Sequence, residues 1–131
     1  MDRKQETVAN GPLIRDVNDL IVYRKAYAMS LEVHRISLEL PRIEQFALAD
    51  QMRRASKGIC ANLAEGFGKQ SVSKAEFKRF VLMAMGSADE MRVWASYCLD
   101  LGYLPEAKAR AWRKEYQDIA KMLAGLHAKW G

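Results

Sequence analysis

The stretch Gly66-Phe67-Gly68-Lys69-Gln70-Ser71 brings together glycines, a lysine and a serine, the residue types that hold a nucleotide phosphate. A phosphate-binding loop requires the pattern G-x-x-x-x-G-K-[ST], with a strand in front of it. Here Leu63 occupies the position of the first glycine, and Gln70 stands where the serine or threonine is needed. The stretch therefore does not predict a nucleotide site. We interpret Gly66 and Gly68 as the end of a helix, because glycine readily adopts the left-handed conformation found there.

The other side chains that could perform catalysis or bind a metal form no recognisable constellation. Neither His34 nor His127 follows a glutamate by three residues, the E-x-x-H spacing of metal centres in helical bundles. Cys60 and Cys98 are isolated, which indicates neither a zinc site nor a disulfide framework, and nothing local pairs either with a histidine as a nucleophile. We expect two buried, reduced thiols in a cytoplasmic protein, with no enzymatic activity, no metal and no other cofactor.

The composition is typical of one ordered helical domain. The chain has 131 residues, of which half are hydrophobic and only three are proline. The longest uncharged run, Phe80–Ala88, has nine residues, whereas a membrane-spanning helix needs roughly 20. The sequence does not open with a cationic stretch followed by an apolar block, the pattern of a secretion signal, so we do not expect the protein to be secreted. We expect residues 1–15 to form a flexible polar tail and residues 16–131 to form a single domain.

Apolar residues recur every three or four positions in four segments, which predicts four α-helices. The segments are Val17 to Leu40, about Glu44 to Phe67, about Lys74 to Leu101, and Pro105 onward. Pro41 separates the first two, because the residue before a proline is disfavoured in the helical region. Ser73 and Glu76 fit the S-x-x-E capping box at the start of the third. Four helices with short connections predict an all-α fold, an antiparallel up-down four-helix bundle.

Tryptophans and the clearest apolar stripe indicate core packing rather than a platform for stacking bases. In the last segment the apolar positions alternate steps of three and four: Ala109, Trp112, Tyr116, Ile119, Leu123, Leu126 and Trp130. Trp94 also lies at core spacing in the third segment.

The second and third segments carry more apolar surface than the core of a single bundle requires. The second segment has an additional face made of Phe46, Ala49, Ser56, Cys60, Ala64 and Phe67. The third adds Leu82, Met85, Val93 and Tyr97 outside its core stripe. A helix that is apolar on most sides is usually buried on more than one of them, so we expect copies of the chain to associate. A wide core face with scattered exposed apolar residues is the alternative.

The excess positive charge is concentrated in one part of the chain. Residues 51–80 contain seven basic and two acidic residues, a net charge of +5, whereas the remainder is balanced. The seven are Arg53, Arg54, Lys57, Lys69, Lys74, Lys78 and Arg79. Such asymmetry concentrates positive potential where a polyanion could bind. The alternative is a solvated face with local ion pairs, for example between Asp50 and Arg53 or Arg54.

An antiparallel pairing of the second and third helices would align these charges. We expect Arg79 to lie beside Ala61 and Lys78 beside Asn62. At 1.5 Å per residue, the cationic ridge from Lys69 to Arg53 would then span roughly 24 Å along the helix pair. A ridge of this length could follow several phosphates of RNA or DNA by charge, with little readout of the bases.

Several linked stretches of the sequence resemble a known family. They are Val17-x-Asp19-Leu20-x-Val22-Tyr23-x-x-Ala26, Leu40-Pro41-x-x-Glu44-x-Phe46-x-Leu48-x-x-Gln51-x-Arg53-Arg54-Ala55, Ile59-x-x-Asn62-x-Ala64-Glu65-Gly66, Phe77-x-x-Phe80, Ala84-x-Gly86-Ser87-x-x-Glu90 and Leu101-Gly102-Tyr103. Over about residues 16–127 the sequence resembles small bacterial four-helix-bundle proteins first noticed as open reading frames inside 23S rRNA intervening sequences. Val17 departs from the pattern, since this family usually has phenylalanine there.

The resemblance implies a bundle that assembles as a ring-like homopentamer without established catalytic activity. It also marks a set of motif positions as structural: Gln51, Asn62, Glu65, Gly66 and Glu90. We expect Glu65 and Glu90 to pair with arginines or to cap backbone groups. Related proteins, the accessory variability proteins of diversity-generating retroelements, look like basic pentameric partners of a reverse transcriptase and its RNA.

These observations predict a non-enzymatic accessory protein, a homopentamer that associates with nucleic acid through the basic surface of its second and third helices, RNA being favoured over DNA. The alternative is a protein-interaction scaffold, for example a partner of a reverse transcriptase, that does not itself bind nucleic acid.

Overall fold

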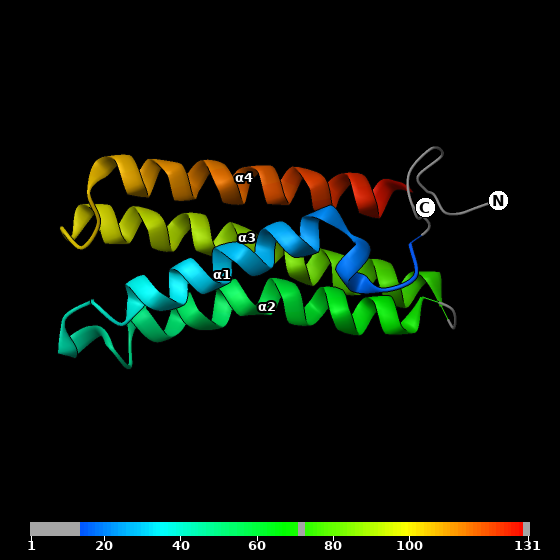
Figure 1. The fold of residues 1–131 in the computed structure, drawn as a ribbon, viewed down its shortest axis with the longest axis horizontal. Helices are drawn as coiled ribbons and strands as arrows, with labels where there is room; N and C mark the ends of the chain where they lie inside the picture. Colours follow the sequence, from blue (N-terminus) through cyan, green and yellow to red (C-terminus); the bar gives the residue numbers. More distant parts are fainter. Residues whose placement is uncertain (1–13, 71–72, 130–131) are drawn as a thin grey trace.

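The structure, a computed structural model, describes residues 14–70 and 73–129. The described residues form the α-helices α1 (Ile21–Ser37), α2 (Leu48–Lys69), α3 (Lys74–Asp100) and α4 (Glu106–Lys129), and the short 3-10 helices η1 (Val17–Asp19) and η2 (Arg42–Glu44). Figure 1 shows these helices side by side. The described part of the chain contains no strand, which confirms the predicted all-α class with four α-helices.

The first predicted helix is divided, and the prediction of one continuous helix from Val17 was wrong. Asp16 accepts a hydrogen bond from the Asn18 amide at 3.2 Å, and Asp19 accepts one from the Asp16 amide at 3.0 Å. These reciprocal bonds close a separate turn, η1, and Leu20 is extended after it. The apolar pattern continued across the break because Val17 and Leu20 are both buried.

The second predicted helix also begins later than expected, at Leu48 instead of Glu44. Glu44 belongs to η2, and its carboxylate has two partners there. It accepts a hydrogen bond from the Leu48 amide at 3.3 Å and one from the Tyr103 hydroxyl at 2.8 Å. Glu44 thereby satisfies an amide at the start of α2 and connects this end of the bundle to the loop between α3 and α4.

The interpretation of Gly66 and Gly68 as a helix end was wrong. Helix α2 continues through both to Lys69, and the cap residue Gln70 keeps right-handed helical angles. Gly66 is buried against α3, where a Cβ atom would lie 2.7 Å from the Cβ of Phe80. The residue therefore allows two helices to approach closely. Among the described glycines, Gly102 has the positive φ, 80°, at the end of α3.

Ser73 caps α3 as the sequence predicted. The second bond of a capping box, from the Ser73 amide to the Glu76 carboxylate, is replaced by other contacts. The Ser73 hydroxyl accepts a hydrogen bond from the Glu76 amide at 3.1 Å. The Glu76 carboxylate pairs with Arg79 at 3.0 Å, and the Ser73 amide donates to the Lys69 carbonyl instead.

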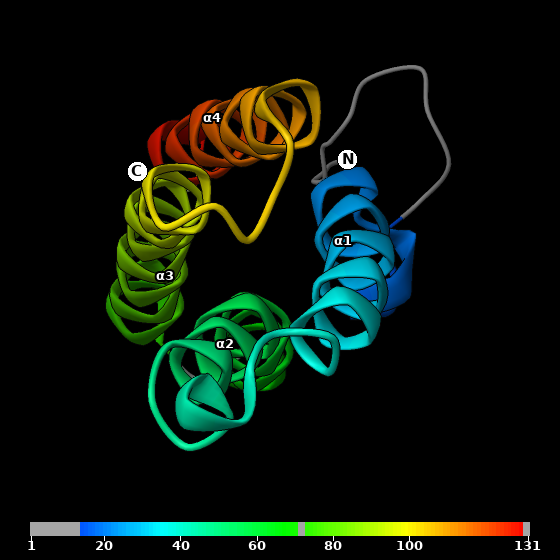
Figure 2. The ribbon, with the colours of Figure 1, turned by 90° about the vertical axis from the view of Figure 1, so that its left-hand side faces the viewer.

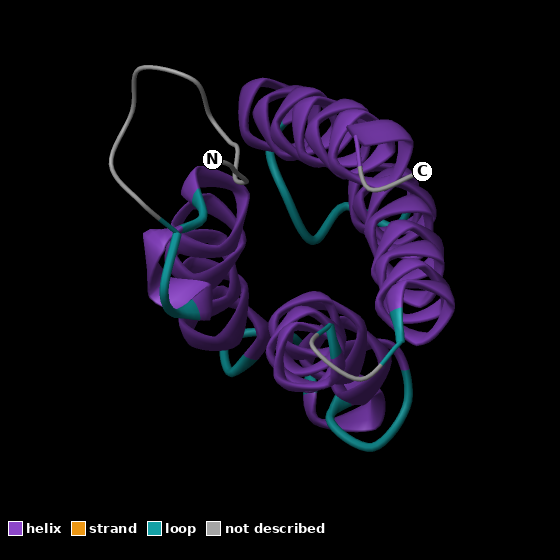
Figure 3. Cartoon of the chain, turned by 90° about the vertical axis from the view of Figure 1, so that its right-hand side faces the viewer, coloured by secondary structure: helices purple, strands orange, loops and turns teal. Residues whose placement is uncertain are grey.

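The four helices surround one hydrophobic core. Seen from one end, α1 and α3 lie on opposite sides of the bundle, with α2 and α4 between them (Figure 2). The view from the other end shows the same arrangement (Figure 3). The largest fully buried side chains come from α2, α3 and α4: Trp112, Tyr116, Phe77, Met52, Ile59 and Leu63. The predicted stripe of α4 is buried from Ala109 to Leu123, whereas Trp130 lies outside the described residues.

Helices α1 and α4 have fewer close backbone approaches than the other neighbouring pairs, and polar side chains connect them. Glu32 accepts hydrogen bonds from the Trp112 indole at 2.6 Å and from Lys108 at 3.2 Å. Lys25 forms an ion pair with Glu115 at 2.6 Å. The Trp112 hydrogen bond is the largest cause of a lowered pKa at Glu32.

Candidate nucleic-acid interface

The seven predicted phosphate-binding residues fall into two groups. Arg53, Arg54 and Lys57 lie in the first half of α2. The second group, which we term the α2–α3 turn cluster, comprises Lys69, Lys74, Lys78 and Arg79. It lies where the two helices are joined. Arg53 and Lys78 are half-buried, and the other five are exposed.

Arg53 is a structural residue. Its guanidinium donates to the Ser37 hydroxyl at 2.9 Å, to the Gln45 side-chain oxygen at 3.3 Å and to the Gln45 carbonyl at 2.7 Å. These bonds join the end of α1, the loop after η2 and the start of α2. A planar fork of donors suits such a site better than an ammonium group does. Because its donors are directed into the protein, we remove Arg53 from the candidate interface.

Lys57 and Arg54 lie on exposed parts of α2. The Lys57 ammonium is 3.0 Å from Nδ1 of His34 in α1. This contact gives His34 the role of a bundle residue with a polar partner in α2. A phosphate that approached Lys57 would compete with a ring nitrogen of His34 rather than with a carboxylate.

The α2–α3 turn cluster is organised by an aromatic ring that the sequence analysis did not include in the site. The Lys69 ammonium lies 5.7 Å from the centroid of the Phe80 ring, and the Arg79 guanidinium carbon lies 4.6 Å from it. Both distances are typical of cation–π contacts. Phe80 therefore holds two cations from different helices together. The sequence had marked Phe80 only as part of the Phe77-x-x-Phe80 pattern.

Arg79 also has an acidic neighbour. Its guanidinium donates to both oxygens of Glu76, at 3.0 and 3.2 Å, and this contact raises the pKa of Arg79. The side chain of Arg79 is nevertheless 54% exposed. It can offer donors to a phosphate, while the pair with Glu76 is open to solvent and correspondingly weak.

The predicted register of the two helices was displaced by about one and a half turns. The sequence placed Arg79 beside Ala61, but Gly66 faces Phe80 and Gly58 faces Ser87, which puts Arg79 about six positions further along α2, near Phe67. Glu65 contributes to the raised pKa of Arg79. The displacement arises because α2 continues through both glycines to Lys69.

The family-motif residues have separate roles. The Asn62 side chain donates to the Gly58 carbonyl at 2.9 Å on the side of α2 where Gly58 faces Ser87 of α3. Gly66 provides the close approach already described. Gln51, Glu65 and Glu90 are exposed. The charge of Glu65 contributes to the raised pKa of Arg79, but the expected pairing of Glu65 and of Glu90 with arginines or backbone groups stays a prediction.

Cysteine and histidine chemistry finds little support among the described residues. Burial raises the pKa of Cys60 and of Cys98 to about 11 in each case, which disfavours the thiolate form that a nucleophile needs. The described part of the chain holds no cluster of three or more side chains suited to a metal ion. Within residues 14–70 and 73–129, no helix combines the length and apolarity of a membrane span.

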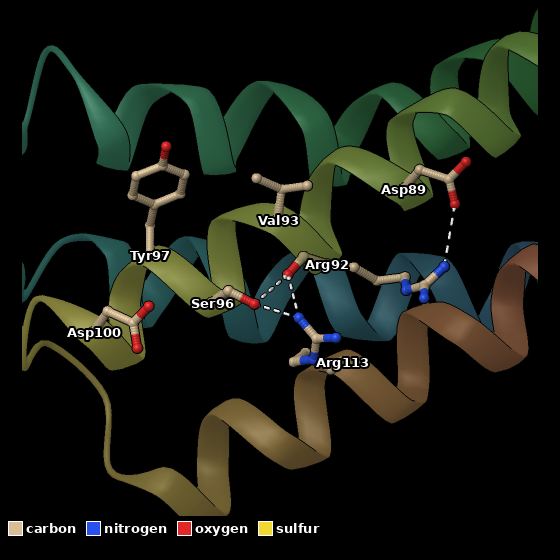
Figure 4. Close-up of a pocket in the computed structure, with 7 residues that line it drawn as sticks. All are labelled: Asp89, Arg92, Val93, Ser96, Tyr97, Asp100 and Arg113. Atoms are coloured by element: carbon tan, nitrogen blue, oxygen red, sulfur yellow. Dashed lines mark hydrogen bonds and ion pairs between the residues drawn. The ribbon is translucent and has the colours of Figure 1, made fainter.

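A separate surface pocket lies along α3, next to α4, with a volume of about 470 Å³. Val93 and Tyr97 project from the same side of α3, and Asp89 and Asp100 lie toward the two ends (Figure 4). Arg92 pairs with Asp89 at 3.5 Å, and Arg113 of α4 donates to the Ser96 hydroxyl. The pocket combines apolar groups with two aspartates and two arginines, Arg92 and Arg113, and none of its lining residues belongs to the α2–α3 turn cluster.

One known family matches most of the length of this chain. A family described as 23S rRNA-intervening sequence protein matches residues 18–125. The chain belongs to this family. The resemblance seen in the sequence to the intervening-sequence family is therefore confirmed.

A solved structure supports the same fold. A protein of unknown function from the S23 ribosomal protein family of Bacteroides thetaiotaomicron is 20% identical, and the match covers 82% of this chain and 96% of that chain with a TM-score of 0.74. At this identity the similarity establishes the helical fold shared with the intervening-sequence family. No curated protein matches the sequence.

Proposed function

We propose that this member of the intervening-sequence family is a non-enzymatic accessory protein that binds nucleic acid, RNA in preference to DNA, through the α2–α3 turn cluster. The bundle is antiparallel and up-down, and it assembles as a ring-like homopentamer. Assembly repeats the cluster in each copy, so that several weak phosphate contacts act together.

The observation that carries this proposal is the gathering of Lys69 and Arg79 over one aromatic ring, with exposed Lys74 in the same turn region. Lysine and arginine bind phosphate by charge and release counterions when they do so. Phe80 restrains the two cations, which lowers the entropy lost when a phosphate binds. The described surface shows no helix arranged to enter a groove and read base edges. The cluster should therefore contact the phosphate backbone of RNA rather than read its bases.

The test uses two double charge reversals of equal size. Lys69→Glu with Lys74→Glu alters the α2–α3 turn cluster, and Lys114→Glu with Lys121→Glu alters an exposed part of α4. Affinity for a single-stranded RNA is measured by fluorescence anisotropy across a salt series. The cluster variant should bind at least roughly tenfold more weakly and reduce the slope of log affinity against log salt by about 1.4, since each single-strand phosphate contact contributes about 0.7. Equal losses in both variants, or no binding by the wild type at low salt, would contradict the proposal.

The exposed apolar residues beside η2 favour a second function, that of a scaffold for another protein. Ile43 is 82% exposed and Phe46 is 97% exposed. Large apolar side chains in such positions are typical of protein-binding surfaces. A reverse transcriptase is one partner that this surface could serve. Under this alternative, Ile43→Ser with Phe46→Ser abolishes partner binding, while the RNA affinity of the wild type is weak at physiological salt.

A further inference from the structure

We infer that the copies assemble through two different surfaces, the outer face of α1 in one copy and the outer face of α3 in the next. The inference rests on the self-association proposed above and identifies the contact that would produce it. The α1 outer face consists of Arg24, Tyr27, Leu31 and Arg35 of α1 together with its C-cap residue, Leu38. The α3 outer face consists of Leu82, Asp89, Glu90, Val93, Tyr97 and Asp100.

The α1 outer face is apolar and basic. Tyr27, Leu31 and Leu38 are 50%, 42% and 59% exposed, although a helix in a lone bundle normally presents polar residues on this side. Arg24 and Arg35 lie beside them and are exposed. The one acidic residue of α1, Glu32, points instead to Trp112 and Lys108 of α4. The exposed charge of this face is therefore positive.

The α3 outer face is apolar and acidic. Leu82, Val93 and Tyr97 are 52%, 48% and 53% exposed. Asp89, Glu90 and Asp100 are exposed on the same helix, and between Leu82 and Asp100 the single basic residue is Arg92, which pairs with Asp89. The pocket beside Val93 and Tyr97 offers space for a side chain from an incoming helix. Of its two aspartates, Asp89 pairs with Arg92, whereas Asp100 is exposed at the other end and can receive a guanidinium. Arg113 of α4, which also lines the pocket, donates to the Ser96 hydroxyl.

The two faces fit one another in charge and in length. At 1.5 Å per residue, the apolar positions of α1 extend about 17 Å from Tyr27 to Leu38, and those of α3 extend about 22 Å from Leu82 to Tyr97. Opposite charges beside an apolar strip favour one orientation of the partner and suppress pairing of like faces. The faces cannot meet within one chain, since α1 and α3 lie on opposite sides of the bundle (Figure 2).

A contact between unlike faces has a specific consequence for assembly. Each copy uses one face for the preceding copy and the other for the following copy, and the repeated contact closes into a ring when the rotation allows it. The α2–α3 turn cluster belongs to neither face. The interaction with nucleic acid therefore remains accessible in the assembled form.

The experiment uses two variants, each with one face disabled by acidic residues. The first carries Tyr27→Glu and Leu31→Glu, and the second carries Val93→Glu and Tyr97→Glu. Mass is measured by light scattering at tens of micromolar, and circular dichroism establishes that each variant is folded. Each variant alone should be a monomer of 14.9 kDa, with self-association weakened at least roughly tenfold. A mixture of the two should form a species of twice that mass and nothing larger, because one intact interface remains for each pair.

A charge exchange tests the same contact without adding polar groups to the apolar strips. Arg35→Glu should weaken assembly, and Glu90→Arg in the same chain should restore it, because every interface then again joins opposite charges. Wild-type protein that stays monomeric would contradict self-association itself. Assembly that persists in either double variant, or a mixture that stays monomeric, would overturn the assignment of faces while leaving the proposed self-association in place.

Discussion

Gly66 of α2 stands so close to Phe80 of α3 that a Cβ atom at position 66 would lie 2.7 Å from the Phe80 Cβ. This is shorter than side-chain carbons can approach, and the neighbouring atom belongs to the base of a ring rather than to a flexible end. The same Phe80 ring contacts Lys69 and Arg79. The spacing of α2 and α3 and the position of the two cations therefore depend on one glycine.

We expect Gly66→Ala to lower the free energy of unfolding by about 1–3 kcal/mol, the usual cost of an added methyl group in a packed site. Gly68→Ala is the matched control. Position 68 has open space for a Cβ atom, and the helical preference of alanine should change stability there by at most about 1 kcal/mol in its favour. Urea denaturation followed by circular dichroism measures both, and equal stability of the two variants would contradict this account of Gly66.

Arg53→Lys should lower the free energy of unfolding by about 1–2 kcal/mol, because an ammonium group cannot reproduce the three hydrogen bonds to Ser37 and Gln45. Arg54→Lys, at the exposed neighbouring position, should be nearly neutral. Chemical denaturation of the two variants tests the distinction. If both lysine variants were as stable as the wild type, Arg53 would return to the set of candidate phosphate ligands.

Glu32 should make stability depend on pH. Hydrogen bonds from Trp112 and then Lys108 lower its pKa in the folded protein below the ordinary value of 4.5. Its contribution to stability is therefore fully present above that value and is lost as the pH falls through the lowered folded pKa. Glu32→Gln should unfold more easily at pH 7 and show a smaller loss of stability between about pH 5 and pH 3 than the wild type. Glu39→Gln, at an exposed position, is the control, and an unchanged pH profile in Glu32→Gln would contradict the prediction.

The two thiols should react slowly in the folded protein. With the pKa of each raised to about 11 by burial, the thiolate fraction at pH 8 is roughly 100-fold below that of an ordinary cysteine. Modification by a chromogenic disulfide reagent should therefore be slow for both Cys60 and Cys98 and become complete in denaturant. Rapid modification of one thiol without denaturant would show that its helix opens readily.

The sequence predicted the features of the fold that burial imposes. Residues such as Ala109, Trp112 and Tyr116 recur at helical spacing because one side of α4 must face the core, and they are buried as expected. The breaks at Leu20 and before Leu48 were not predictable in the same way. Val17 and Leu20 remain in phase with the helical pattern although a 3-10 turn carries them, so periodicity alone could not locate the break.

Glycine and arginine were harder to interpret because each has two structural uses. A glycine after a helical segment fits a helix end and fits close contact between helices, and only the position of Phe80 distinguishes these roles for Gly66. A run of two arginines indicates a basic surface. One of the two, Arg53, is directed inward because its acceptors come from Gln45, in a loop that looked helical in the sequence.

The polar connection between α1 and α4 has a consequence for the order in which the bundle opens. The ion pairs of Lys25 with Glu115 and of Glu32 with Lys108 are partly exposed, and such pairs weaken with salt and acid, whereas the apolar contacts among the other helices do not. Helix α1 should thus detach as a unit before global unfolding, and its amide protons should exchange with solvent deuterium faster than those of α2, α3 and α4.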